Sequence, residues 1–306
     1  MCRNLWKMTA GRVYQVSKSS DTMEIVYKKE LLETKSTFNT ILSSWEDSLY
    51  QKSLIAAIYH QSFHVLLALQ DYAINHLHHT FPSTDVKLLD RGTFNIVVQN
   101  TKENEILRIC DDPKIWNKAS YELLQNNKNT GFAPIIKCVE ERVLKTYTVR
   151  YNIIPLLKPI DENAIDDTKM SKCVHNVIDF LSKHQEYNFT DTHMGNFMQS
   201  IDEKQYYISD IDIDMSSNSK IPEPNIVMYE EQRKLGKPIK ISYNMSLYVS
   251  ICAKFHVECN NFTCSLIALT LFELAKWNHR IIITDEVEKK LFETMSKYFP
   301  IDGDEK

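Results

Sequence analysis

The sequence predicts an α+β protein of two lobes, a small lobe rich in strands followed by a mostly helical lobe. Three observations predict this class. A chain of 306 residues can bury a large core, and this length suggests one large domain or two lobes. Residues 83–155 contain short β-branched runs around one helical segment, whereas residues 156–306 contain mainly longer segments with helical periodicity. Residues 1–82 precede this change, which falls just after Pro82, and form an N-terminal extension.

In the small lobe, the runs VKLLDRGTFNIVVQN and EILRIC predict a hairpin and a third strand. Residues 113–129 predict a helix with Pro113 near its first turn, and Gly131 suits the break that follows it. The runs PIIKCVEERV and KTYTVRYNII predict two further strands. The expected order is therefore three strands, a helix and two strands.

Helical periodicity dominates the remainder. We expect helices over residues 167–186 and in three segments between residue 243 and the C-terminus, with a substrate-side loop over residues 216–242. Residues 45–79 predict one long or broken helix in the extension. It places His60 and His64 four residues apart on one face, but we interpret them as part of an ordinary helix face because no third metal ligand is in view.

Composition limits the classes of partner. A formal net charge of −4 gives no global attraction to nucleic acid. No apolar run reaches the roughly 18 residues of a membrane span, and the N-terminus lacks the apolar centre of a signal peptide, so we expect an intracellular, cytoplasmic protein. Seven scattered cysteines predict reduced thiols. Cys252, His256, Cys259 and Cys264 lack a CxxC pair, which favours buried core thiols over a zinc site.

The most informative segment is TDTHMGNFMQSIDEKQYYISDIDIDM, residues 190–215. Asp191 and Asn196 stand five residues apart, and Asp210 ends an aromatic and β-branched run. Phosphoryl transfer needs a carboxylate near the attacking hydroxyl, and the magnesium ion that bridges the phosphates needs hard oxygen ligands. This segment can deliver all three groups. The alternative is a loop in which Asp191 and Asn196 only form turns, because both residue types favour turns.

On these residues the chain resembles the protein-kinase-like superfamily, which includes protein kinases and small-molecule kinases of the aminoglycoside and choline type. The resemblance spans roughly residues 87–213 and implies a kinase-like fold whose N-lobe covers residues 83–155 and whose C-lobe covers residues 156–306. It implies that Asp191 orients the acceptor hydroxyl and receives its proton, and that Asn196 and Asp210 bind the metal.

Three other segments extend the resemblance. In DRGTFNIV, Gly92, Thr93 and Phe94 match the middle of a glycine-rich phosphate loop, although Asp90 and Asn95 replace its flanking glycines and a plain hairpin turn remains possible. Arg108 stands where the family has a lysine that contacts the phosphates. Glu122 matches its ion-pair partner, with a surface glutamate as the alternative. The run YNIIPL, residues 151–156, matches the hinge that surrounds the adenine.

Other positions depart from the protein-kinase pattern. His193 stands where serine/threonine kinases carry lysine, and DxHxxN is frequent in the small-molecule branch, so the acceptor class stays open. Phe189 replaces the histidine of the HRD motif, which suggests packing against the metal-binding strand. Asp212 replaces the glycine of the DFG motif and is either a further metal ligand or a solvent-facing residue.

Together these features predict a phosphotransferase that uses ATP and Mg²⁺ (or Mn²⁺), with Asp191 as base and Gly92, Thr93, Phe94 and Arg108 at the phosphates. The expected partners are the nucleotide and a hydroxyl acceptor, with protein Ser/Thr slightly favoured over a small molecule. The alternative is a pseudokinase that binds a partner through its scaffold and the helix of residues 45–79. The eroded glycine loop and Arg108 favour this alternative, and the intact Asp191, Asn196 and Asp210 oppose it.

Overall fold

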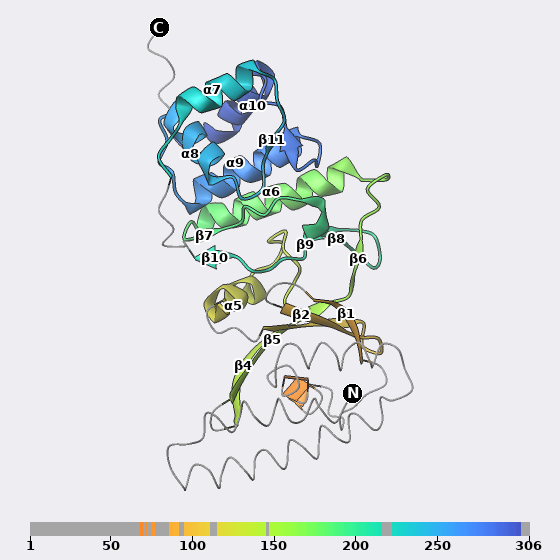
Figure 1. Ribbon diagram of the computed structural model, residues 1–306. Coiled ribbons are helices and arrows are strands. Elements are labelled where there is room, and N and C mark those ends of the chain that lie inside the picture. Colours follow the sequence, from red (N-terminus) through yellow and green to blue (C-terminus); the bar gives the residue numbers. More distant parts are fainter. Residues whose placement is uncertain are drawn as a thin grey trace, which may run out of the picture. The chain divides into compact units, whose positions relative to one another are not determined.

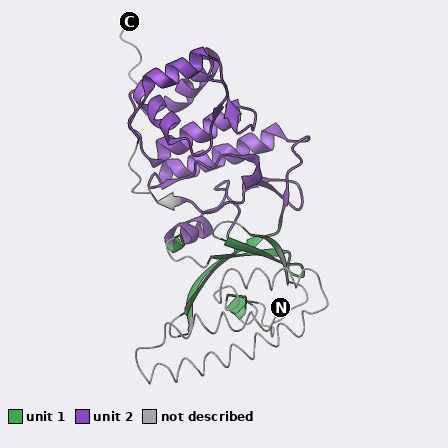
Figure 2. Cartoon of the chain, in the orientation of Figure 1, with its two compact units in different colours: residues 1–118, 135–156 green, residues 119–134, 157–306 purple. Residues whose placement is uncertain are grey.

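The protein is known from a computed structural model that describes residues 68–69, 71–72, 75–76, 86–91, 95–110, 115–144, 147–215 and 222–300. Within these ranges the fold contains a five-stranded sheet, smaller sheets and six α-helices, which confirms the α+β class (Figure 1). The chain divides into two compact units (Figure 2). Unit 1 comprises residues 1–118 and 135–156, and unit 2 comprises residues 119–134 and 157–306.

Unit 1 is built on an antiparallel sheet of five strands in the order β1-β2-β3-β5-β4. Its strands are β1 (Val86–Arg91), β2 (Asn95–Asn100), β3 (Glu105–Cys110), β4 (Lys137–Leu144) and β5 (Tyr147–Pro155). These are the five strands that the β-branched runs predict. Their buried side chains include Ile96 and Val98 of β2, Ile109 of β3 and Ile153 of β5.

The described residues between 68 and 76 belong to unit 1 and contact this sheet through buried polar groups. Tyr151 of β5 donates a hydrogen bond of 2.7 Å to Asp71, and both residues are buried. Tyr72 donates to Glu105 at 3.0 Å and accepts from Asn100 at 3.0 Å. Because buried polar groups are costly unless they are paired, these bonds fix one register of this segment on the sheet.

Unit 2 contains three small antiparallel sheets and most of the helices. β6 (Leu157–Pro159), β8 (Phe197–Ser200) and β9 (Tyr206–Ile208) form one sheet; β7 (Tyr187–Asn188) pairs with β10 (Asp214–Met215), and β11 (Ile239–Lys240) pairs with β12 (Arg280–Ile281). The helices are α5 (Lys118–Asn126), α6 (Asp167–Lys183), α7 (Ile226–Lys234), α8 (Met245–Lys254), α9 (Asn261–Leu274) and α10 (Asp285–Met295).

The core of unit 2 surrounds α9, which is buried along its whole length except near its ends (Figure 1). Helices α6 and α9 each begin after an N-cap residue whose side chain accepts a hydrogen bond from a backbone N–H of the first turn. Asp166 accepts a hydrogen bond from the Lys169 N–H at the start of α6, and Asn260 accepts from the Thr263 N–H at the start of α9. The predicted segments at residues 167–186, 243–257, 263–277 and 284–299 thus contain helices. Among the described helices, none is long and apolar enough to cross a membrane.

One predicted helix is confirmed with different bounds, and one predicted loop is wrong. The helix predicted over residues 113–129 begins at Lys118, so Pro113 lies outside its first turn; Asn117, of a type favoured at N-caps, immediately precedes it. The segment predicted as a loop, residues 216–242, contains α7 and β11. Sequence periodicity missed α7 because Tyr229 is its single buried residue.

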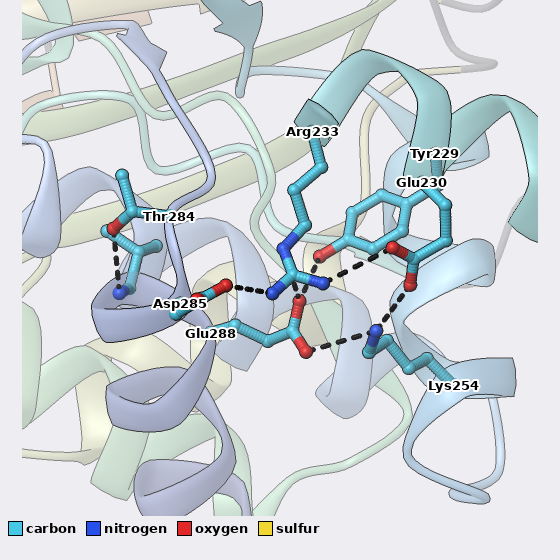
Figure 3. A network of polar contacts seen from close by, with 8 residues as sticks. Tyr229, Glu230, Arg233, Lys254, Thr284, Asp285 and Glu288 are labelled. Carbon is cyan, nitrogen blue, oxygen red and sulfur yellow. Dashed lines mark hydrogen bonds and ion pairs between the residues drawn. The ribbon is translucent and has the colours of Figure 1, made fainter. Parts of the chain in front are cut away.

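A network of charged groups holds α7 against α8 and α10 (Figure 3). Glu288 of α10 is central: its carboxylate lies 3.2 Å from Arg233 Nε of α7 and 3.0 Å from Lys254 Nζ of α8. Glu288 also accepts a hydrogen bond from the Tyr229 hydroxyl. Glu230 pairs with both cations, and Asp285 pairs with Arg233. Because several ion pairs share partners, the network stabilises α7 more than one isolated surface pair would.

We expect Glu288→Ala to lower the free energy of unfolding by about 1.5–3 kcal/mol, because hydrogen bonds to both cations and to Tyr229 are lost. Asp285→Ala is the matched control: it removes an acid from the same first turn of α10, but the Asp285 side chain is 94% exposed, whereas that of Glu288 is 16% exposed. The control should cost less than about 1 kcal/mol. Urea unfolding of both variants measures the difference, and equal losses would show that the contacts of Glu288 contribute no more than the exposed Arg233–Asp285 pair.

Candidate active site

The loop that carries Asp191 is held at both of its ends. It begins after β7, where the Phe189 N–H donates to Ser265 Oγ of α9 at 2.9 Å. The buried Phe189 ring lies edge-on to Phe132, with ring centroids 5.5 Å apart, and Phe132 forms a bridge with Ile208 of β9. The loop ends in a 3₁₀ turn, η1 (Met194–Asn196), directly before β8. Phe189 therefore packs near the strand that leads to Asp210.

Three side chains contact the Asp191 carboxylate, two of them through hydrogen bonds. Ser242 Oγ donates to Asp191 Oδ1 at 2.8 Å, and Asn196 Nδ2 donates to Asp191 Oδ2 at 2.9 Å. His193 Nε2 lies 3.4 Å from the same Oδ2. The Asn196 amide also donates to the Asp191 backbone oxygen at 2.9 Å. Donors on both oxygens fix the carboxylate plane, so Asp191 is preorganised as an acceptor for a fourth group.

These contacts shift the pKa values of Asp191 and His193. Burial alone raises the pKa of Asp191, but hydrogen bonds from His193, Ser242 and Asn196 outweigh burial and lower this pKa to about 2. The hydrogen bond to Asp191 is the main cause of a raised pKa at His193, and the charges of Asp191 and Asp210 add to it. Asp191 is therefore a carboxylate at neutral pH, and the His193 imidazole beside it takes up a proton more readily than a free histidine does.

We expect an NMR titration to find the pKa of His193 above its ordinary value of 6.5. A raised pKa means that this pairing stabilises the folded chain fully below about pH 6.5 and that the contribution is lost as pH rises through the folded-state pKa. Asp191→Asn removes the charge and should lower the pKa of His193, whereas Asp202→Asn in the β8–β9 turn should not. A pKa for His193 that is unaffected by Asp191→Asn would contradict the pairing.

Asp210 follows β9 in a segment that is fastened to Asn196. The Ser209 N–H and hydroxyl both donate to the Asn196 backbone oxygen, at 2.8 and 3.2 Å. The Asp212 N–H donates to Asp210 Oδ1 at 3.3 Å, and the neighbouring Ile211 is buried. The structure therefore brings Asp210 to the part of the loop that contains Asn196 and His193, as the spacing predicts.

Asp212 is bonded to the protein rather than turned toward solvent. Its Oδ1 accepts a hydrogen bond of 2.5 Å from the Tyr121 hydroxyl, and Tyr121 is a buried residue of α5. The solvent-facing alternative for Asp212 is therefore wrong. This bond links α5 to the segment that contains Asp210.

Asn196 and Asp210 are the side chains in this segment that could hold a magnesium ion. The Asn196 amide nitrogen donates both hydrogen bonds to Asp191, so the amide oxygen is the atom suited to a cation. Magnesium commonly takes one or two protein carboxylates plus substrate phosphates. Within the described part of the chain, no group of three or more His, Cys, Asp or Glu side chains could hold a metal ion by itself.

The roles of the remaining predicted site residues stay predictions. Gly92, Thr93 and Phe94 fall outside the described residues. Arg108 belongs to unit 1, where it lies in β3 opposite Val97 and Asn152, and Glu122 is an exposed residue of α5 in unit 2. Their ion pair therefore stays a prediction.

The predicted hinge is corrected in part. Tyr151, Asn152 and Ile153 lie within β5 and pair with both β3 and β4, so their backbones serve the sheet rather than a ligand. These residues lie in the sheet because the strand-forming sequence is continuous and extends β5 as far as Pro155.

Ser242 and Tyr121 were not predicted as site residues. Ser242 follows β11 and is 51 residues from Asp191 in sequence, and Tyr121 is 91 residues from Asp212. No local motif signals either contact, because both depend on the packing of distant elements. The folding of unit 2 buries Ser242 and Tyr121 and brings them to Asp191 and Asp212, respectively.

No protein-family model and no curated protein matches this chain. Among solved structures, it is similar to the kinase PK-1 of Cydia pomonella granulovirus, with a TM-score of 0.40 and 12% sequence identity. The similarity covers 68% of this chain and 75% of the viral kinase. Values this low do not establish a shared fold or activity.

Proposed function

We propose that the chain is a kinase-like phosphotransferase that transfers the γ-phosphate of ATP to a hydroxyl acceptor. One observation carries the proposal: Asp191 is held by Ser242, Asn196 and His193, and Ser209 fastens the Asp210 segment to the same Asn196. A turn-forming loop needs neither three donors on one carboxylate nor a second acidic segment beside it. Phosphoryl transfer depends on positioning and charge stabilisation, which this arrangement supplies.

Each residue has a distinct role in this proposal. Asp191 orients the acceptor hydroxyl and takes its proton; a pKa of about 2 makes it a weak base, so orientation is its main contribution. Asn196 and Asp210 hold Mg²⁺ or Mn²⁺, which neutralises charge on the phosphates when it is bound. Arg108 and the segment of Gly92, Thr93 and Phe94 are proposed for the phosphates by resemblance, with Glu122 as the partner of Arg108.

We favour a protein Ser/Thr acceptor slightly over a small molecule. Tyr243 directly follows Ser242, the residue that bonds to Asp191, and is 62% exposed, so its ring can contact an extended acceptor bound at Asp191.

The experiment is measurement of ADP formation from ATP and Mg²⁺, with pools of protein acceptors and of small amino-alcohol and sugar acceptors supplied separately. We expect metal-dependent turnover that Asp210→Asn abolishes and Asp202→Asn, an exposed acid of the β8–β9 turn, leaves unchanged. Arg108→Ala should raise the KM for ATP, and Arg108→Lys should partly restore it. ATP binding without turnover in either pool would favour the pseudokinase scaffold instead.

A further inference from the structure

Three cysteine thiols meet at the junction of α8 and α9. Cys252 lies in the last turns of α8, Cys259 lies in the connecting loop, and Cys264 lies in the first turns of α9. The Sγ atoms of Cys259 and Cys264 are 3.6 Å apart. The Cys252 thiol interacts with Cys259, and this interaction raises the pKa of Cys252. All three thiols are free. The prediction of buried thiols is thus confirmed for Cys252 and Cys264.

The three thiols differ in exposure. Cys252 and Cys264 are 1% and 4% exposed, whereas Cys259 is only partly buried. Negative charge therefore belongs on Cys259, because burial disfavours a thiolate at the other two positions. The buried thiols are then S–H donors to Cys259. Bonds from Cys252 and Cys264 accordingly lower the pKa of Cys259, and the same bonds, together with burial, raise the pKa values of its two partners.

The loop around Cys259 is anchored at both ends. The Val257 N–H donates to the Cys252 backbone oxygen at 3.0 Å, and the Thr263 hydroxyl donates to the Glu258 backbone oxygen at 2.8 Å. These bonds hold Cys259 beside its partners. A disulfide requires an S–S distance of about 2.05 Å, so the sulfurs of Cys259 and Cys264 need to approach by roughly 1.5 Å. Rotation of the Cys259 side chain in a loop supplies a movement of that size.

We propose that Cys259, Cys264 and Cys252 form a peroxide-reactive thiol site, in which Cys259 is the nucleophile, Cys264 is the resolving thiol and Cys252 positions the nucleophile. The Cys259 thiolate attacks one oxygen of hydrogen peroxide, which gives a sulfenic acid and releases hydroxide. The Cys264 sulfur then attacks the sulfenic sulfur, forms the disulfide and releases water. In total, two thiols are oxidised and one peroxide is reduced to two waters.

The test is peptide mapping by mass spectrometry after the full-length protein is treated with limiting hydrogen peroxide. We expect a Cys259–Cys264 disulfide that dithiothreitol reverses, formed before oxidation of Cys110, Cys138 or Cys173. Iodoacetamide at pH 7 should label Cys259 in the untreated protein at least about 10-fold faster than those three cysteines. These measurements on the wild-type chain do not depend on a variant that folds.

Variants separate the roles of the three thiols. Cys264→Ser should leave a Cys259 sulfenic acid that dimedone traps, and Cys252→Ala should slow labelling of Cys259 several-fold. Cys173→Ser is the matched control, because Cys173 is a buried thiol of α6 outside the cluster; it should change neither result. A different disulfide, no disulfide, or Cys259 labelling no faster than that of the other cysteines would overturn the proposal.

Discussion

Replacement of Asp191 by asparagine is expected to lower kcat for phosphoryl transfer by about 100- to 10,000-fold. The variant keeps the size of the side chain and an oxygen that can accept from Ser242 or Asn196. The neutral amide, however, loses the negative charge that orients the acceptor hydroxyl, and it can no longer take the proton of that hydroxyl. Asp191 is proposed to act on the acceptor rather than on the metal. Affinity for the magnesium nucleotide should therefore change less than threefold, and steady-state kinetics together with nucleotide titration measure both quantities.

Ser242→Ala is the graded companion of this variant. It removes the bond of 2.8 Å to Asp191 Oδ1 but keeps the carboxylate, so we expect a smaller loss of kcat, about 10-fold. The hydrogen bond from Ser242 lowers the pKa of Asp191, so removal of the Ser242 hydroxyl should raise this pKa. The acidic limb of the pH profile of kcat should then shift to higher pH. If Asp191→Asn retains kcat within threefold of wild type, Asp191 has no role in the reaction.

Gly131→Ala is expected to produce the largest loss of stability, at least about 3 kcal/mol. Gly131 has a φ of +82°, and an added Cβ would lie 2.6 Å from the Cys173 oxygen and 2.9 Å from the Val177 nitrogen. Both atoms belong to the backbone of α6, which cannot move aside cheaply. The Gly131 oxygen also accepts from the Ile208 N–H at 2.8 Å, so the strain would reach the end of β9, two residues from Asp210.

Gly236→Ala isolates the contribution of the backbone conformation. Gly236 also has a positive φ, of +61°, but no atom lies within 4 Å of the position that its Cβ would occupy. This variant should cost about 1 kcal/mol. Urea unfolding compares the two, and similar losses would mean that the close approach to α6 is unimportant.

The sequence predicted the elements whose signals are local. The five strands of unit 1 followed from β-branched runs, and α6 followed from apolar residues at helical spacing such as Met170, Val174, Val177 and Leu181. By contrast, α7 has no apolar face of this kind. Ion pairs from Arg233 to α10 hold it in place instead. Charged pairs between helices leave no periodic signal in a single sequence.

The candidate site shows the same division. The spacing of Asp191, Asn196 and Asp210 was sufficient to predict that they belong together, since a short loop and a hairpin connect them. Ser242 could not be found in this way, because its contact with Asp191 depends on how β11 and β12 pair. The role of Asp212 likewise depends on Tyr121 of α5, which lies far away in the sequence.

The central claim is a metal-dependent nucleotide site, and calorimetric titration with a non-hydrolysable ATP analogue tests it most directly. With Mg²⁺ the wild-type chain should bind the analogue at least about 10-fold more tightly than with EDTA. Asp210→Asn should remove this metal dependence, and the control Asp202→Asn should retain it. Binding that is equally tight with and without Mg²⁺, or unaffected by Asp210→Asn, would contradict the account.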